Sequence, residues 1–91
     1  MTTSFHNVTI RTTVNKLMSI IPSHDVEVSK DVDEKYQYYF YFINSMGEEI
    51  TIYDWKEYRE VGLDEVLEFH IGSSDFFNGL LAKEELVAIL N

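Results

Sequence analysis

The chain has 91 residues, of which 45% are apolar and 14% aromatic, with no cysteine and a formal net charge of -9. This length predicts a single domain over residues 1–91, because a second domain would be too small to bury its own core. The apolar content excludes a disordered acidic tail, and the lack of cysteine excludes disulfides, thiol nucleophiles and cysteine-bound metals.

The first third of the chain predicts a strand, a short helix and a second strand. Residues 5–10 have the alternation typical of a strand. A helix is predicted next, with Thr12 or Thr13 as its N-cap and Pro22 as its end. Its apolar positions recur at helical spacing: Val14, Leu17, Met18 and Ile21. Residues 26–28 then predict a short edge strand.

The middle of the chain predicts a β-hairpin. Residues 36–43 are almost entirely aromatic and favour a strand. Alternation predicts one face with Tyr36, Tyr38, Phe40 and Phe42 and the other with Tyr39, Tyr41 and Ile43. Because both faces are aromatic, we interpret this strand as internal and covered by a helix on at least one side. Residues 44–47 have turn composition and join it to a second strand over residues 49–53.

The last third predicts a strand over residues 65–71 and a C-terminal helix. The helix is predicted to begin at Ser73 or Ser74, with Asp75 in its first turn and Gly79 as a weak point. Its predicted core-facing stripe is Phe76, Phe77, Leu80, Leu81, Val87 and Leu90. The whole order predicts an α+β fold: a small antiparallel sheet of three or four strands with an N-terminal and a C-terminal helix packed on it.

The sequence contains little catalytic chemistry. Glu68 and His70 share a strand face two residues apart, a spacing that suits a metal-ligand or acid–base pair, but no third ligand accompanies them. An exposed polar strand face is the simpler interpretation of this pair. The four glycines follow no phosphate-binding spacing. We therefore expect no enzymatic activity, no cofactor and no metal site.

Direct binding to nucleic acid or to a membrane is not expected. The seven lysines and arginines are scattered singly among acids and form no basic stripe. Residues 36–42 have the composition of a base-stacking platform, but without basic neighbours core packing explains that composition better. The apolar runs are shorter than the ~20 residues of a membrane span, and the N-terminus has no signal-peptide pattern. We therefore expect a cytoplasmic protein.

The acidic residues concentrate in two stretches of the sequence. Carboxylates at alternate strand positions lie about 6.6 Å apart, a spacing comparable to that of the phosphates along DNA. A row of such carboxylates can therefore imitate a DNA backbone, although an ordinary solvated acidic surface is the alternative. The residues predicted to bind a partner are Asp25, Glu27, Asp31, Asp33, Glu34, Glu48, Glu49, Asp54, Glu57, Glu60, Asp64, Glu65 and Glu68.

The segments IYDWKEYR (residues 52–59) and EVLEFHIG (residues 65–72) resemble small phage-encoded proteins. Together with the length and acidity, they make the chain similar to the Arn-like anti-restriction proteins of T-even phages. The resemblance implies a DNA mimic in the host cytoplasm that binds host DNA-binding proteins, namely the restriction endonuclease McrBC and the nucleoid protein H-NS. A homodimer would lengthen the acidic strip, although no feature of the sequence requires one.

Two hypotheses about binding stay open at this point. The first is the charge mimic. The second is an acidic interaction module, such as a toxin antagonist or an assembly factor, that binds through an apolar patch. Trp55, Tyr58 and Arg59 are interpreted as an aromatic corner that pins the long connection after residue 53 to the sheet, in preference to a partner contact.

Overall fold

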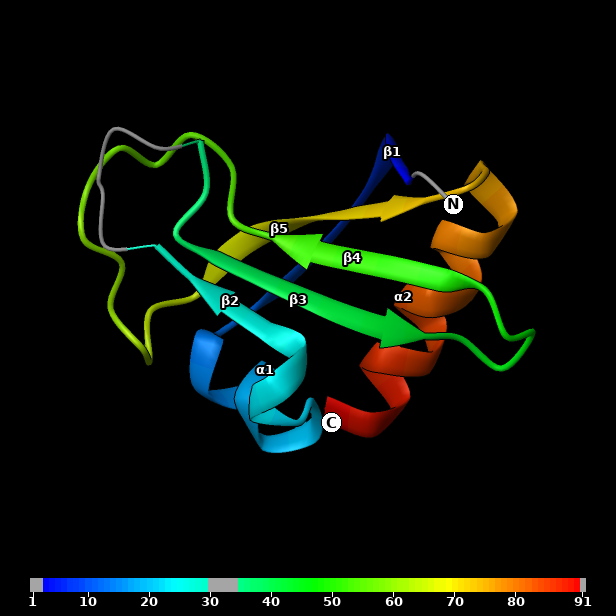
Figure 1. Ribbon diagram of the computed structural model, residues 1–91, viewed down its shortest axis with the longest axis horizontal. Helices are drawn as coiled ribbons and strands as arrows, with labels where there is room; N and C mark the ends of the chain where they lie inside the picture. The colour runs from blue at the N-terminus through cyan, green and yellow to red at the C-terminus, as the bar shows by residue number, and fades with distance from the viewer. Residues whose placement is uncertain (1–2, 30–34, 91) are drawn as a thin grey trace.

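The computed structural model describes residues 3–29 and 35–90, which form an antiparallel sheet of five strands with two α-helices (Figure 1). In chain order the elements are β1 (Ser4–Thr12), α1 (Val14–Ile20), the 3-10 helix η1 (Ser23–Asp25), β2 (Val26–Val28), β3 (Tyr38–Ile43), β4 (Glu49–Tyr53), β5 (Leu67–Ser73) and α2 (Phe76–Leu90). The strand order is β1-β5-β4-β3-β2. The α+β class is confirmed. The sheet has five strands and not three or four, because β1 and β2 each pair with an internal strand and form its two edges.

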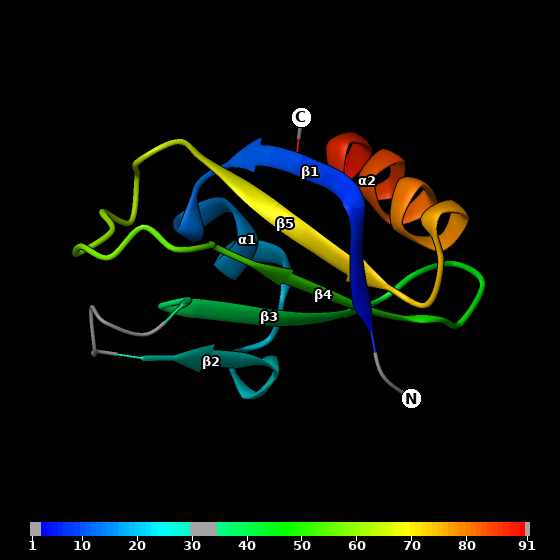
Figure 2. The ribbon, with the colours of Figure 1, turned by 90° about the horizontal axis from the view of Figure 1, so that it is seen from above.

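The core lies on one face of the sheet. Phe40 of β3, Ile52 of β4 and Phe69 of β5 are fully buried there, and Leu17 of α1 and Leu86 of α2 belong to the same cluster. In Figure 2, α2 runs alongside β1 and β5, the strands that it contacts most extensively. Because side chains alternate along a strand, the neighbours of these core residues point to the opposite face. No helix in the described part of the chain has the length and apolar character needed to cross a membrane.

The close approach of α2 to the sheet depends on small residues, which contradicts the predicted stripe of large ones. Its buried residues are Gly79, Ala82 and Leu86. A Cβ atom on Gly79 would lie 2.8 Å from Oγ of Ser73, so glycine lets the helix backbone come this close. Three large side chains of the predicted stripe point outward instead: Phe76 is 49%, Phe77 79% and Val87 39% exposed. Leu90 of that stripe does pack against the core.

Local signals set the ends of the helices and the hairpin turn. The Thr13 hydroxyl caps α1, as predicted. α2 begins later than predicted, because the Asp75 carboxylate accepts a hydrogen bond from the backbone N–H of Asn78 at 2.8 Å and so acts as its cap. The hairpin between β3 and β4 is confirmed, with Gly47 at φ 77° in its turn.

The carboxylate of Asp54 joins two connections of the sheet. Its side chain accepts hydrogen bonds from the backbone N–H of Gln37 at 3.0 and 3.1 Å and from that of Tyr38 at 2.7 Å. The Gln37 amide in turn donates to the carbonyl of Arg59 and accepts from the N–H of Val61. Asp54 is only 1% exposed, so its predicted place in an acidic binding surface is wrong: this carboxylate satisfies backbone donors inside the fold.

Replacement of Asp54 with alanine should lower the free energy of unfolding by at least about 2 kcal/mol, because two backbone donors lose their acceptor and each buried unsatisfied donor costs about 1–3 kcal/mol. Urea denaturation followed by circular dichroism measures this change. Glu60→Ala is the matched control, since Glu60 is an exposed acid of the same connection and should change stability by less than about 0.5 kcal/mol. Equal effects of the two substitutions would contradict a structural role for Asp54.

Candidate functional site

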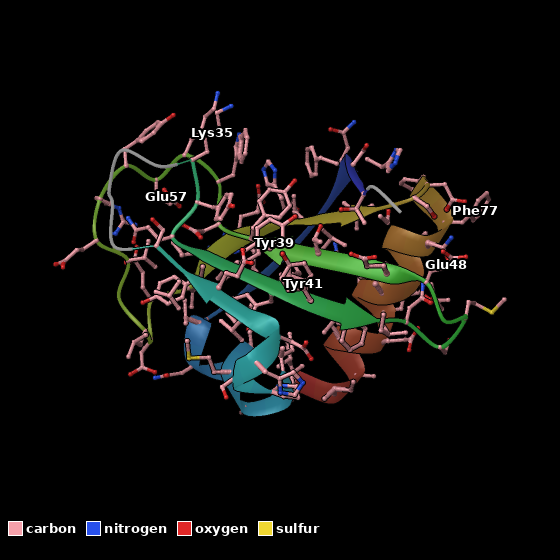
Figure 3. All side chains as sticks on the ribbon, in the orientation of Figure 1. Lys35, Tyr39, Tyr41, Glu48, Glu57 and Phe77 are labelled. Carbon is pink, nitrogen blue, oxygen red and sulfur yellow. The ribbon has the colours of Figure 1, made fainter. Side chains whose placement is uncertain are left out.

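The face of the sheet opposite the core carries a group of contacting rings, which we call the aromatic face. In Figure 3, Tyr39 and Tyr41 lie in front of the strands. The aromatic face comprises Phe5, Tyr36, Tyr39, Tyr41, Tyr53, Trp55 and His70. These side chains are half-buried or exposed and lie outside the core cluster. The sheet therefore has a second, partly solvent-exposed apolar surface.

The rings form a continuous row across four strands. The centroid distances are 5.2 Å between Tyr41 and Tyr39, 5.3 Å between Tyr39 and Tyr53, and 5.6 Å between Tyr53 and His70. The row ends on β1, where the Phe5 ring stacks on His70 at 3.9 Å. The strand register explains this order, because Tyr39 pairs with Tyr53 and Tyr53 pairs with His70. Cross-strand aromatic pairs of this kind stabilise a sheet.

Trp55 extends the row at the end of β4. Its ring lies 5.8 Å from that of Tyr53 and stacks on His70 at 5.7 Å, so Trp55 contacts the sheet as the aromatic-corner interpretation expects. The Nζ atoms of Lys35 and Lys56 lie 5.9 and 5.4 Å from the Trp55 centroid, within the range of cation–π attraction. Trp55 nevertheless stays 37% exposed.

The backbone beside Trp55 is strained. Lys56 and Tyr58 have φ values of 54° and 52°, in the left-handed region that side chains other than glycine rarely occupy. Each such residue costs on the order of 1–3 kcal/mol, and strain of this kind is concentrated at functional sites. Tyr58 is also 51% exposed, so its ring does not contribute to a buried corner.

Burial favours the uncharged forms of three side chains on the aromatic face, namely His70, Tyr53 and Tyr41. Burial lowers the pKa of His70, although the nearby Glu68 carboxylate opposes this shift. Burial also raises the pKa of Tyr53, with a smaller effect from Tyr39. The pKa of Tyr41 is raised by burial and then by the Glu27 carboxylate. Tyr41 and Tyr53 therefore keep their hydroxyl protons.

The predicted acidic residues do not gather in one place. Figure 3 shows Glu57 and Glu48 toward opposite ends of the sheet. The β4–β5 connection carries Glu57, Glu60, Asp64 and Glu65, the turn after β3 carries Glu48, and Glu49 begins β4. Asp25 and Glu27 lie at the β2 edge, and Glu68 lies on β5. Asp31, Asp33 and Glu34 lie outside the described residues.

Among the residues that the structure describes, most carboxylates form no ion pair with a lysine or arginine. Over residues 3–29 and 35–90, Glu65 is the one carboxylate in an ion pair with a lysine or arginine, namely Arg59. This contact lowers the pKa of Glu65, as does the N–H of Gly62. Asp64 accepts a hydrogen bond from the Asn15 amide at 2.7 Å, which leaves its charge in place. The charge is therefore available to an external cation.

The Glu68 and His70 pair is not joined by a third ligand. Across the part of the chain that the structure describes, no three histidine, aspartate or glutamate side chains come together as metal ligands. The three ring contacts of His70, with Phe5, Tyr53 and Trp55, instead make it a member of the aromatic face.

Sequence reasoning missed the aromatic face because it assigned the rings of residues 36–42 to core packing. That assignment holds for Phe40, which is fully buried, but not for Tyr39 and Tyr41. Tyr36 was also placed on the face of Phe40, which is wrong, because β3 begins only at Tyr38 and the Tyr36 ring contacts Tyr39 at 4.8 Å. The signal was the alternation of Tyr39 and Tyr41, which continues as Tyr53 in the paired strand.

A scan against protein-family models and searches of curated proteins and solved structures found no match to this chain. The resemblance to Arn-like proteins therefore stays a prediction. The charge and the geometry of the chain itself support the functional proposal.

The stability of the fold should depend on the protonation of His70. Because the folded chain holds this proton less tightly than the unfolded chain, the free energy of unfolding should fall as the pH drops below about 6.5 and rise again as it returns. His70→Gln should remove this component, as measured by urea denaturation across that pH range. His24→Gln, at an exposed position, is the control. An unchanged pH profile in His70→Gln would contradict the proposed burial effect.

Proposed function

We propose that this chain is a binding protein without catalytic activity that occupies the DNA-binding surface of a basic protein. The observation that supports this most directly is the net charge of -9. Among the described carboxylates, only Glu65 forms an ion pair with a lysine or arginine, so the rest of the charge is not neutralised by such pairs. A negative field of this kind attracts cationic protein surfaces and repels nucleic acid.

The distribution of the carboxylates is compatible with a DNA mimic that presents negative charge over a distance of about one DNA turn. The protein extends 33 Å along its longest axis, and Glu57 and Glu48 lie toward the two ends of that axis (Figure 3). One turn of duplex DNA is about 34 Å long, so a protein that grips one turn meets negative charge at comparable separations. The charges are sparser than phosphates, and the aromatic face lies between them.

The class of partner follows from the same charge. Proteins that bind DNA through lysine and arginine have the complementary surface. In line with the resemblance to Arn-like anti-restriction proteins, we propose host restriction endonucleases such as McrBC and nucleoid proteins such as H-NS as partners, in the cytoplasm of an infected bacterium. The protein would then protect phage DNA by keeping these proteins off it.

Neutralising acids at both ends should weaken binding by the sum of small contributions. The variant with Glu48→Gln, Glu49→Gln, Glu57→Gln and Glu60→Gln should lose at least about fourfold in affinity, because four charges at about 0.2–1 kcal/mol each sum to roughly 0.8–4 kcal/mol. Glu57→Gln alone should change affinity by about fivefold or less. The measurement is retention of lysate proteins on the immobilised chain at low and high salt, with and without excess duplex DNA.

The control for this experiment is Glu84→Gln on α2, outside the predicted surface. Thermal unfolding shows whether each variant keeps its fold. Retained proteins that are DNA-binding and are released by both salt and DNA support the proposal. Two results would rule out a distributed charge mimic. One is a retained partner that neither salt nor DNA releases, and the other is full loss of binding in Glu57→Gln alone with the fold intact.

The exposed apolar side chains of α2 favour a second candidate function, that of an interaction module that binds through apolar contacts. Phe77 is 79% and Ile89 54% exposed, in addition to Phe76 and Val87, and Phe77 lies at the edge of the molecule in Figure 3. Monomeric proteins rarely expose large contiguous apolar patches, and those that do commonly bind through them. A toxin antagonist or an assembly factor would use such a surface.

Phe77→Ser separates this candidate from the charge mimic. Because Phe77 is exposed, its replacement should leave the free energy of unfolding within about 0.5 kcal/mol. If α2 forms the interface, Phe77→Ser should abolish a binding that survives high salt. Leu63→Ser is the matched control, since Leu63 is 47% exposed in the β4–β5 connection and does not belong to α2. Full retention of partners by Phe77→Ser would exclude the α2 interface.

A further inference from the structure

The aromatic face attracts cations within the protein itself. The ammonium groups of Lys35 and Lys56 come from two different connections of the sheet, and both lie over the Trp55 ring. Their backbones are joined as well, because the Lys56 N–H donates to the Lys35 carbonyl at 2.6 Å. Lys56 holds this position at a strained, left-handed φ. The fold thus tolerates strain where a ring face meets positive charge.

Carboxylates flank the row of rings at both ends. Glu27 on the edge strand β2 pairs in register with Tyr39, so its side chain shares the face of Tyr39. At the other end, Glu68 precedes His70 by two residues and therefore lies on the same face of β5. Arg11 of β1 is directly opposite Glu68 in the register. Glu27 and Glu68 are both exposed.

Rings with carboxylates beside them match one side chain better than any other. A guanidinium group is planar and weakly hydrated, so it stacks on aromatic rings and still binds a carboxylate through two N–H groups. A lysine ammonium is compact and strongly hydrated and gains less from a ring. Single-stranded nucleic acid would also stack on the rings, but its phosphates would meet Glu27, Glu68 and a net charge of -9.

We propose that the aromatic face binds arginine side chains on the surface of the basic protein partner. This inference rests on the proposed function and adds a site to it. The carboxylates at the two ends of the molecule supply long-range attraction, and the ring row with Glu27 and Glu68 selects arginine over lysine at contact. The Tyr53 hydroxyl can donate a further hydrogen bond to the partner.

Trp55 is the sole tryptophan of the chain, so its fluorescence reports on this face directly. The experiment titrates the full chain with a short polyarginine peptide and with a polylysine peptide of equal length, at low and at physiological salt. Polyarginine should bind about three- to tenfold more tightly and change the Trp55 emission, because cation–π contacts add to the charge attraction. The preference should persist at the higher salt, which screens exposed charges.

Two pairs of variants localise the binding. Glu27→Gln on the aromatic face and Glu84→Gln on α2 remove the same charge, but only Glu27→Gln should reduce the preference for arginine. Tyr39→Leu should likewise reduce it and Phe77→Leu should not. Thermal unfolding checks each fold, and Glu27→Gln, at an exposed position, carries the test if Tyr39→Leu is unstable.

Three outcomes would overturn the proposal. Equal affinity for the two peptides with unchanged Trp55 emission would show that only net charge matters, and the proposed function would stand without this site. Equal effects of Glu27→Gln and Glu84→Gln would place the contact elsewhere. Tighter binding of oligothymidylate than of polyarginine would make the face a nucleic-acid platform and would contradict the proposed function as well.

Discussion

The hydrogen bonds of the Asp54 carboxylate hold together the end of the sheet at which β3 begins and β4 ends. This carboxylate accepts the backbone N–H groups of Gln37 and Tyr38, at the start of β3, from a position just after β4. Because these two connections are thereby held together, Lys35 and Trp55 become neighbours. The same aspartate would be a costly buried charge if these donors were absent. The placement of Lys35 beside Trp55, at one end of the aromatic face, thus depends on this internal carboxylate.

The fold separates two kinds of apolar surface and leaves both partly open. α2 comes close to the sheet through Gly79 and Ala82, so the large side chains on its outer side, such as Phe77, stay in solvent. The opposite face of the sheet exposes the ring row between the acidic ends. Electrostatic attraction acts over distance but discriminates poorly, whereas stacking acts only at contact. The two together would give a highly charged protein a means of choosing among basic partners.

Much of the fold could be predicted from local patterns. The cap at Thr13, the hairpin between residues 43 and 49, the edge strand over residues 26–28 and the α+β class all follow from signals within a few residues of one another. The C-terminal helix was predicted, but its core-facing stripe was wrong for Phe76, Phe77 and Val87, because the helix is rich in apolar residues and contains more than one plausible core stripe. The face of α2 that packs against the sheet depends on Ser73 of β5 and Val8 of β1, whose side chains lie closest to the position of a Cβ atom on Gly79.

The sequence by itself determined the net charge, the absence of thiol chemistry, the strand and helix segments and the aromatic composition of β3, since these depend on residue types and short-range periodicity. The tertiary structure alone decided which acid is internal and which rings are exposed. Asp54 and Glu57 are similar residues of one charged segment, yet the first is buried against backbone donors and the second lies at the surface. Likewise, Tyr53 and His70 come together only through cross-strand register. Such contacts join distant parts of the chain, and local sequence patterns carry no information about them.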